Sequence, residues 1–436
     1  MNVDPTETGS RIDAFDIVIS GAGIGALTLA NYLAPLGFRI LILDRRPGLD
    51  PVHRGELVQP LGLEILSELS LLDQLLESPH TVNRSFDFLN DRGELLMTSR
   101  YDMGSSSYPY AISIEPHDMD QILARNLSSY SHVVLRHESD FVGYETGQDG
   151  VLISYTRGGR TEKVLARVLV GDDGRHSRVR ELAEIAGTVT PYQDSYLGAS
   201  LLLPEDEASL PASILDTNGR YFLGPRSIFF FFSVSARRRF FLVLLPNRDR
   251  ERFFSKGIDP VLANLDRLVP GFAWAARNSG IDNPDEWREL SVYKVDLHTW
   301  CKDGVVLMGD AAHAMNPHVA QGRNQAMEDA RVLAPVLSKA LLSASSGPVV
   351  SRIDLLPYEN KRLPITRSLH RLADEMTLVW NSGAPLLVWG RGKVFKGIDK
   401  LPSLQHKIVT TIGGTSVLPL SATDRVLALL RGLLPL

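Results

Sequence analysis

The chain has 436 residues, which is too long for one ordinary hydrophobic core, so two or more domains are expected. With 44% hydrophobic residues, 22% charged residues and a formal net charge of -5, its composition is that of a globular protein and gives no electrostatic reason to expect nucleic acid as a partner. Cys301 is the only cysteine, which excludes an internal disulfide and a cysteine-based zinc site, so no metal site is predicted.

No targeting or membrane-spanning segment is predicted. Residues 1–14 are polar and contain no apolar run, unlike a signal peptide. No stretch reaches the roughly 18 uninterrupted apolar residues of a spanning helix. We therefore expect a cytoplasmic protein, and a reducing compartment also suits the single cysteine.

The chain begins with a strand, a glycine turn, a helix and a second strand. Apolar runs at residues 15–19 and 39–43 predict the two strands, and residues 27–36 predict a helix that Gly37 ends. Both strands are apolar throughout, which is typical of a parallel sheet buried on both faces. This order predicts a βαβ unit.

The turn after the first strand has the pattern Gly-x-Gly-x-x-Ala. Gly21 permits the tight turn, Gly23 lets the backbone approach a pyrophosphate, and Ala26 lets helix and strand pack closely. The helix that follows presents free N–H groups to phosphates. Asp44 ends the second strand, where a carboxylate accepts hydrogen bonds from ribose hydroxyls and disfavours a 2′-phosphate. The pattern predicts a site for FAD or NAD rather than NADP, and a glycine turn without a ligand is the alternative.

Helices and strands then alternate. They are predicted over residues 59–76 (helix), 86–97 and 111–114 (strands), 118–130 (helix) and 133–170 (several strands).

Residues 192–246 alternate aromatic and β-branched residues between glycines and prolines, which predicts a separate antiparallel sheet. Residues 229–232 form one of its strands, with alternate phenylalanine rings in the core. The other rings are expected either in the core or along a substrate cavity, and Phe222, Phe240 and Phe241 allow the same two interpretations.

The rest of the chain returns to the first pattern and ends in helices. The predicted elements are helices over residues 248–280, a strand over 287–297, a buried parallel strand over 304–308, a long helix over 324–342 and further helices over 355–436.

Two later turns repeat the order of buried strand, Gly/Asp turn and helix start. The first contains Asp173, and the second contains Gly309 and Asp310. Carboxylates that follow parallel strands lie at the crevice where such folds bind ligands, and Asp310 there can accept hydrogen bonds from a polyol chain. Gly322 lets the backbone approach a flat ring, and the helix start at Asn324 favours a ring that gains negative charge on reduction. An aspartate that only caps a helix is the alternative at each turn.

The three turns, in this order, resemble those of the flavoprotein monooxygenases of the para-hydroxybenzoate hydroxylase type. The resemblance covers roughly residues 14–345. Its motifs are Gly-x-Gly-x-x-Ala with Asp44, Asp173-Gly174 with Ser177 and Val179-Arg180, and Gly309-Asp310-Ala-Ala-His313 with Pro317, Gly322, Asn324 and Asp329-Ala330.

The resemblance implies an α/β fold with a Rossmann-like FAD-binding domain, an inserted antiparallel β-sheet substrate domain and a helical C-terminus. The expected ranges are 1–80, 111–185 and 286–350 for the FAD-binding domain, 81–110 and 186–285 for the substrate domain, and 351–436 for the helical C-terminal region.

The resemblance also implies which residues bind FAD. They are Gly21, Gly23, Ile24, Gly25, Ala26, Asp44, Arg45, Arg54, Arg125, Asp173, Gly309, Asp310, Pro317, Gly322, Arg323 and Asn324. For Arg125 an exposed arginine is the alternative. The third motif departs from the family's pattern at Ala320, Arg323 and Ala326, and Arg323 is expected either beside the flavin or pointing to solvent.

The activity that the resemblance implies is a cycle in which NADH or NADPH reduces FAD, the reduced flavin adds O₂, and the flavin hydroperoxide hydroxylates or epoxidises the substrate. Because the cofactor carries this chemistry, no catalytic residue is predicted. His313 is expected to be structural, with a proton relay as the alternative. A flavin-dependent reductase and a non-catalytic FAD-binding protein remain open.

A hydrophobic aromatic, quinone-like or polyketide-type molecule is the expected substrate, since the apolar strands offer no charge to pair with a small benzoate. The segment 424–436 is rich in leucine and valine and also carries Arg425 and Arg431. It is expected either to lie at a membrane interface or to pack on its own protein or on a partner in a homodimer.

Overall fold

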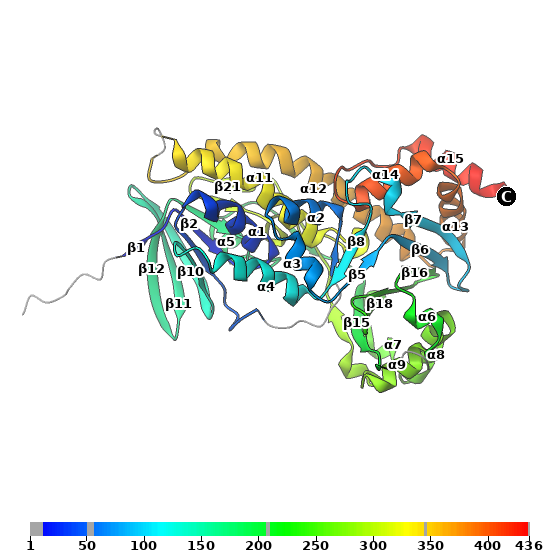
Figure 1. Ribbon diagram of the computed structural model, residues 1–436. Helices are drawn as coiled ribbons and strands as arrows, with labels where there is room; N and C mark the ends of the chain where they lie inside the picture. The colour runs from blue at the N-terminus through cyan, green and yellow to red at the C-terminus, as the bar shows by residue number, and fades with distance from the viewer. Residues whose placement is uncertain (1–11, 50–55, 206–209, 344–346, 435–436) are drawn as a thin grey trace, which may run out of the picture.

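The structure is a computed structural model that describes residues 12–49, 56–205, 210–343 and 347–434. Within these residues the strands form five sheets, of which a six-stranded and a seven-stranded sheet are the largest. The molecule is elongated, and the seven-stranded sheet and the last helices lie toward the end that carries the C-terminus (Figure 1).

In the described part of the chain, the six-stranded sheet has the order β21-β22-β13-β2-β3-β9, and its pairs are parallel except for the edge pair β21–β22. The strands are β2 (Ile17–Ser20), β3 (Ile40–Leu43), β9 (Val133–Arg136), β13 (Val168–Gly171), β21 (Cys301–Lys302) and β22 (Val305–Leu307). Strands β2, β3, β13 and β22 are buried along their whole length, which confirms the prediction from their apolar sequences. Because β13 lies between β2 and β22, the turns that follow these three strands meet at one edge.

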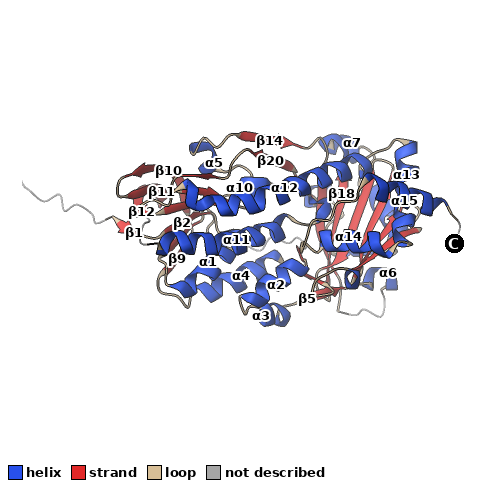
Figure 2. Cartoon of the chain, turned by 90° about the horizontal axis from the view of Figure 1, so that it is seen from above, coloured by secondary structure: helices blue, strands red, loops and turns tan. Residues whose placement is uncertain are grey.

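Helices lie on one side of this sheet and a four-stranded sheet lies on the other (Figure 2). Helix α1 packs against α4 and α11, and α11 packs against α12. These helices are α1 (Ile24–Leu33), α4 (Pro116–Leu127), α11 (Gly322–Leu342) and α12 (Arg352–Trp380), and the four-stranded sheet consists of β1 (Asp13–Ala14), β10 (Ser139–Gly147), β11 (Gly150–Arg157) and β12 (Arg160–Ala166).

The helix predicted over residues 59–76 is two helices, α2 (Pro60–Glu68) and α3 (Leu72–Glu77). Ser70 between them has φ 59°, a left-handed conformation that ends the first helix. The remaining short elements of this part are η1 (Ala34–Leu36), β4 (Glu56–Val58), β5 (His80–Asn83), η2 (Tyr101–Met103), β8 (Ala111–Ile114), α5 (Arg178–Leu182), β14 (Gly187–Pro191), β20 (Tyr293–Leu297), α10 (Asp310–His313) and η6 (Pro317–Val319).

The seven-stranded sheet has the order β19-β15-β18-β17-β16-β6-β7 among the described residues, and its pairs are antiparallel except for β16–β6. Its strands are β6 (Ser85–Asn90), β7 (Leu95–Arg100), β15 (Ser195–Leu202), β16 (Gly219–Gly224), β17 (Ser227–Ser233), β18 (Arg238–Leu245) and β19 (Arg288–Leu290). The antiparallel sheet predicted over residues 192–246 thus gains two strands from before it and one from after it.

The two faces of the seven-stranded sheet pack against different helices. Phe229 and Phe231 of β17 belong to one apolar cluster with helices α6 (Ala212–Leu215), α7 (Arg250–Phe253), α8 (Asp259–Leu268) and α9 (Phe272–Asn278). Phe230 and Phe232 belong to a second cluster that faces α12 and the C-terminal helices. The alternation along this strand follows from the period of two in any strand.

The C-terminal helices α13 (Pro385–Asp399), α14 (Pro402–Ile412) and α15 (Ala422–Leu433) lie over this second face (Figure 2). Helices α13 and α15 touch backbone to backbone: a Cβ on Gly397 would lie 1.7 Å from the carbonyl oxygen of Ala428, and one on Gly432 would lie 1.8 Å from that of Lys393. One face of the last helix therefore packs on its own protein, while Val426 and Leu430 on the other face are exposed. Among the described residues, no helix is both long and apolar enough to cross a bilayer.

Candidate cofactor and substrate site

The three turns that the sequence singles out lie together. Gly21 has φ +99°, and a Cβ on it would lie 2.2 Å from the carbonyl oxygen of Asp172. Gly309 has φ +57°, and a Cβ on it would lie 2.4 Å from Oδ1 of Asp172. Glycine is needed at both positions because the Asp172 turn lies between them.

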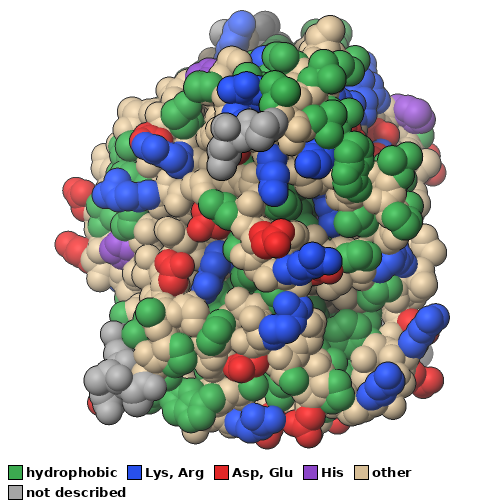
Figure 3. All heavy atoms as spheres, turned by 90° about the vertical axis from the view of Figure 1, so that its right-hand side faces the viewer, with side chains coloured by type: hydrophobic (Ala, Val, Ile, Leu, Met, Phe, Trp, Pro, Cys, Tyr) green, Lys and Arg blue, Asp and Glu red, His purple; other side chains and the backbone are tan. Residues whose placement is uncertain are grey.

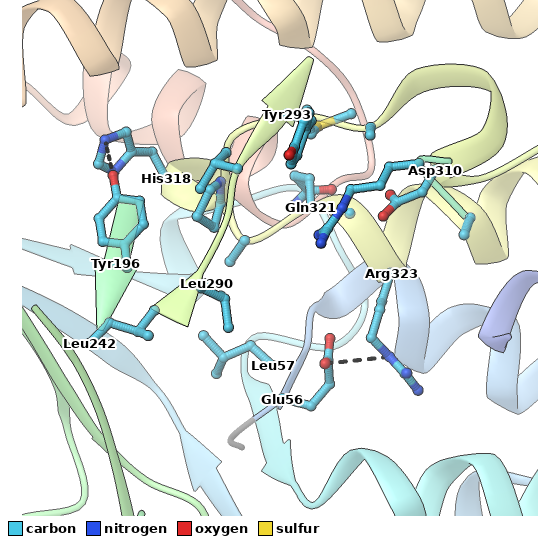
Figure 4. Close-up of a pocket in the computed structure, with 18 of the residues that line it drawn as sticks. Glu56, Leu57, Tyr196, Leu242, Leu290, Tyr293, Asp310, His318, Gln321 and Arg323 are labelled. Atoms are coloured by element: carbon cyan, nitrogen blue, oxygen red, sulfur yellow. Dashed lines mark hydrogen bonds and ion pairs between the residues drawn. The ribbon is translucent and has the colours of Figure 1, made fainter. Parts of the chain in front are cut away.

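A cavity of about 420 Å³ opens in front of these turns (Figure 4). One wall comes from the turns and the other from the seven-stranded sheet. The lining residues that the sequence predicts are Gly23, Ile24, Gly25, Asp310, Pro317, Gly322 and Arg323, and those of the sheet include Tyr196, Tyr221, Phe230, Phe232, Phe240 and Leu242. The cavity thus joins a polar, glycine-rich wall to an aromatic one.

Asp44 lies against the glycine turn. Its Oδ2 accepts a hydrogen bond from the Ala22 N–H at 2.8 Å and from Nη2 of Arg46 at 2.7 Å. Burial would raise the pKa of Asp44, but the hydrogen bonds from Arg46 outweigh it and hold this pKa below its usual value, so the carboxylate is ionised at neutral pH. Arg46, which the sequence analysis missed, pairs with Asp44, whereas the predicted Arg45 is exposed.

Asp173 caps a helix. Its Oδ2 accepts hydrogen bonds from the backbone N–H groups of Arg178 at 2.8 Å and Val179 at 3.1 Å, at the start of α5. Arg180 donates to the carbonyl oxygen of Ala311 at 2.7 Å and so links the second turn to the third. Asp173 itself is not among the residues that line the cavity.

Asp172 does line the cavity, and the sequence analysis did not assign it a role. Its Oδ2 accepts a hydrogen bond from the Ala26 N–H at 2.7 Å, in the first turn of α1. Burial raises the pKa of Asp172 well above its usual value, and the carboxylates of Asp310 and Asp329 add to the shift. The doubled aspartate in Gly-Asp-Asp-Gly is the sequence signal that could have indicated it.

Asp310 begins α10 and is exposed to the cavity. The turn that carries Asp310 is bound by Asp329 on the side away from the cavity. Asp329 Oδ2 accepts the Gly309 N–H at 2.9 Å and lies 2.5 Å from Nε2 of His313, and its Oδ1 accepts from Nε of Arg362 at 2.7 Å. His313, Asp329 and Arg362 are all buried. His313 lies behind the cavity wall, which favours its structural interpretation over a proton relay.

Arg323 points away from solvent. From the first turn of α11 its side chain reaches toward β4, where Nε lies 3.4 Å from Oε2 of Glu56 (Figure 4), and Nη2 donates to Oδ1 of Asp120. Burial would lower the pKa of Arg323, but the two carboxylates outweigh it and raise this pKa. The alternative in which Arg323 points to solvent is wrong, because the buried Asp120 and the half-buried Glu56 hold it.

A chain of polar groups lies where the cavity meets the sheet. His318 Nε2 lies 2.9 Å from the Tyr196 hydroxyl oxygen (Figure 4) and 3.1 Å from Oδ1 of Asn381. Asn381 donates to Asp194, which forms an ion pair with Arg226 at 3.0 Å. Burial lowers the pKa of His318 to about 4, so its ring is neutral at neutral pH. His318 directly follows Pro317, and only the fold reveals that it faces the sheet.

The remaining predicted residues lie at the margins. Asn324 is buried, and its side chain accepts the Gln59 N–H and donates to the Leu57 carbonyl oxygen, so it fixes the start of α11. Arg125 is exposed in the last turn of α4, which agrees with the alternative interpretation of this residue as an exposed arginine. Arg54 lies outside the described residues.

The residues present fit a dinucleotide. Gly23 precedes α1 and has no side chain to cap it, and although the Ala26 N–H donates to Asp172, Gly23, Ile24 and Gly25 line the cavity, so the start of the helix faces it. The Asp44 carboxylate lies at one end of this wall and Asp310 at the other, as a ribose and a polyol chain would require. A dinucleotide-binding wall that faces an aromatic sheet defines the class of flavin- or nicotinamide-dependent oxidoreductases.

The chain belongs to the FAD binding domain family, whose pattern matches residues 14–373. It is a FAD-dependent monooxygenase, as the resemblance of its three motifs to those of the para-hydroxybenzoate hydroxylase type predicts.

Two relatives and one solved structure illustrate the match. The chain is 27% identical over 330 residues to 6-methylpretetramide 4-monooxygenase of Streptomyces rimosus, which covers 75% of this chain and 76% of that protein. It is 23% identical over 358 residues to 6-hydroxynicotinate 3-monooxygenase of Pseudomonas fluorescens, covering 79% and 90%. Its fold is similar to that of p-nitrophenol 4-monooxygenase PnpA of Pseudomonas putida, with a TM-score of 0.78, 17% identity and coverage of 93% of this chain and 100% of that one.

Proposed function

We propose that this enzyme uses NADH or NADPH and O₂ to insert one oxygen atom into a hydrophobic aromatic, quinone-like or polyketide-type molecule. The observation that carries the proposal is the single cavity in which the three turns face the rings of Phe230, Phe232 and Phe240. When bound, FAD would supply the redox chemistry, which is hydride acceptance from the nicotinamide and activation of O₂.

The residues proposed to hold FAD lie along the polar wall. The glycine turn and the α1 N-terminus hold the pyrophosphate, Asp44 holds the adenosine ribose, and Asp310 holds the ribityl chain. Pro317 and Gly322, which line the cavity, would lie beside the flavin ring, and the buried Asn324 would hold the helix start behind them. The half-buried pair of Arg323 with Glu56 joins the α11 start to β4.

The aromatic wall is proposed to orient the substrate and to exclude water. Its side chains come from β15, β16, β17 and β18, which form a rigid sheet. The polar groups at this wall include neutral His318 and the hydroxyls of Tyr196 and Tyr221, which can donate a hydrogen bond to a substrate oxygen or nitrogen or accept one from it. The names of the two relatives, 6-methylpretetramide 4-monooxygenase and 6-hydroxynicotinate 3-monooxygenase, support a ring compound as the substrate, and only the first supports a large one.

Substrate-stimulated oxidation of NADH or NADPH tests the proposal. The purified yellow protein is screened against hydrophobic phenols, quinones and polycyclic ketones, and we expect oxidation to rise severalfold above the basal rate with at least one class. A flavin-dependent reductase would reduce a quinone without consuming stoichiometric O₂. A non-catalytic FAD-binding protein would retain its visible absorption and oxidise neither nucleotide.

We propose further that the exposed face of α13 and α15 contacts a membrane surface, in an otherwise cytoplasmic enzyme. Apolar and basic side chains are mixed on this end of the molecule (Figure 3). The exposed side chains of α13 and α15 include Trp389, Leu430, Arg425 and Arg431. Sedimentation with anionic vesicles tests the contact, and we expect binding that salt weakens. Vesicle-independent dimers in size-exclusion chromatography would favour the homodimer instead.

A further inference from the structure

A second cavity, of about 350 Å³, lies beside the first on the same face of the seven-stranded sheet. We call it the apolar chamber. Phe86 and Phe88 of β6 form its wall on the sheet side, and Met376 of α12, Val394 of α13 and Ile408 of α14 form its wall on the helix side. Its volume lies within the range of roughly 300–1,000 Å³ that is typical of small-molecule sites.

The apolar chamber adjoins the cavity at the three turns. Five residues line both spaces: Leu57, Tyr221, Phe230, His318 and Ala320. The Tyr221 ring stacks on Phe230 with centroids 4.1 Å apart and on Phe88 at 5.5 Å, so it forms part of the continuous sheet wall. We infer that a single ligand that passes between these shared side chains can occupy both spaces.

One buried polar group in the apolar chamber lacks a partner. Gln59 is 0% exposed, and its Oε1 accepts a hydrogen bond from the Tyr101 hydroxyl at 2.6 Å. Its Nε2 has no hydrogen-bond partner among the described residues. Buried amide groups are normally satisfied, so this N–H group is available to an acceptor atom of a ligand. Gln59 lies next to Asn324, which accepts its backbone N–H at 3.0 Å, so this position is at the cofactor end of the chamber.

The other end of the apolar chamber reaches the protein surface. Leu386 and Leu387 of α13 line it and are 76% and 40% exposed, and Leu420 lies before α15. The entrance thus lies on the C-terminal face, away from the glycine turn. An apolar ligand can enter here without passing the cofactor.

We propose that the apolar chamber binds an alkyl or prenyl chain of the substrate, while the aromatic head of the same molecule reaches the cavity at the three turns. A carbonyl oxygen between head and chain accepts a hydrogen bond from Gln59 Nε2. The oxidation of the head rests on the proposed function, whereas the binding of the chain does not. The substrate class is therefore an acylated or alkylated aromatic compound with a long apolar chain.

Isothermal titration calorimetry of the FAD-loaded protein, without NADH or NADPH, tests the proposal. The probes are 4-hydroxyphenyl alkyl ketones whose chains lengthen from methyl to decyl. We expect the affinity to rise about two- to fourfold with each added methylene until the chamber is filled, since a buried CH₂ contributes about 0.8 kcal/mol. An affinity that does not depend on chain length overturns the proposal.

Two matched variants locate the chain. Met376→Trp fills the apolar chamber, whereas Leu378→Trp adds the same ring to an exposed position of the same helix. We expect Met376→Trp to lose the chain-length dependence and Leu378→Trp to keep it, with the visible absorption of FAD unchanged in both. Equal behaviour of the two variants places the chain elsewhere and overturns the proposal.

Gln59→Leu tests the polar contact. The wild type should prefer the ketones to 4-alkylphenols of equal length by about tenfold, and the variant should lose this preference. An unchanged preference shows that Gln59 does not bind the carbonyl. Binding that depends on chain length, without oxidation of any probe, would contradict the proposed function but support chain binding in the apolar chamber. Oxidation of short probes, without any dependence of affinity on chain length, would support the proposed function but contradict chain binding in the chamber.

Discussion

At the scale of single residues, the aspartates around the three turns have different environments and therefore different charges. Asp44 is held ionised by Arg46, whereas Asp172 lies among other carboxylates with one backbone N–H group. Two aspartates near the same turns thus differ in charge: Asp44 is an anion, whereas Asp172 has a raised pKa.

Asp172 should make FAD binding depend on pH. Its pKa is raised in the folded protein, so it is protonated at low pH and becomes an unfavourable charge beside the phosphates as pH rises through that pKa. We expect FAD affinity to fall with rising pH in the wild type. Asp172→Asn should bind FAD more tightly at high pH, on the order of tenfold, with a flatter profile. Fluorescence titration of the apoprotein at several pH values measures this, and parallel profiles would contradict the role.

Asp310 should hold the ribityl chain. Asp310→Ala removes the carboxylate at the cavity, and we expect FAD affinity to fall about tenfold to a hundredfold, since hydrogen bonds to charged groups contribute about 1.5–3 kcal/mol. The FAD content after dialysis measures the effect. Asp282→Ala, at an exposed position outside both cavities, is the control, and equal retention in the two variants would refute the assignment.

Residue types on the polar wall could be predicted from the sequence because each follows a strand with a fixed local pattern. Gly21, Asp44 and Asp310 were found in this way. Arg46, Asp172 and Gln59 were not, because their roles depend on neighbours that are distant in the sequence. Arg323 shows the same limit, since its partner Asp120 is 203 residues away.

At the scale of elements, the start of α11 and the turn after β22 are joined through a buried ionic cluster. Asp329 on α11 binds the Gly309 N–H, His313 on α10 and Arg362 on α12. Burial would raise the pKa of Asp329, but His313 and Arg362 outweigh it and lower this pKa. The cluster therefore fixes three helices to the turn that carries Asp310.

Asp329→Asn should destabilise the fold. It leaves Arg362 as a buried charge without its counterion, and we expect the free energy of unfolding to fall by about 3–5 kcal/mol in urea denaturation. Because the pKa of Asp329 is lowered, its contribution is present above the usual carboxyl pKa and is lost as pH falls through the folded-state value. The difference between wild type and variant should thus shrink in acid, and a difference that grows there would contradict the account.

The contact between α13 and α15 should tolerate no side chain at its centre. Gly397→Ala places a Cβ against the Ala428 carbonyl oxygen, and we expect loss of stability by about 1–3 kcal/mol. Gly390→Ala, on the same helix with open space around it, should instead be neutral or stabilise by up to about 1 kcal/mol. Thermal unfolding of both variants measures this, and similar melting temperatures would mean that the helices separate readily.

At the scale of the whole molecule, two sheets meet at one cavity and the C-terminal helices add a second one. The α/β fold could be predicted because the three nucleotide-type turns lie on both sides of the aromatic strands in the sequence. The assignment of residues 81–110, which contain β6 and β7, to the substrate domain came from the family resemblance alone, and the pairing of β19 was not predicted, since strand pairing over such distances leaves no local pattern. The apolar chamber could not be predicted from the sequence either, because its walls come from four elements that are distant in the sequence, β6, α12, α13 and α14.

The transfer of one oxygen atom from O₂ is the central claim, and isotope labelling tests it most directly. The FAD-loaded protein is supplied with NADH or NADPH, a long-chain 4-hydroxyphenyl ketone and ¹⁸O₂, and the products are analysed by mass spectrometry. We predict a product that carries one ¹⁸O atom per molecule of nicotinamide oxidised. The account would be contradicted if NADH or NADPH is oxidised but the ¹⁸O is found only in hydrogen peroxide or water. This result would have to hold for this ketone and for every other substrate that stimulates the oxidation.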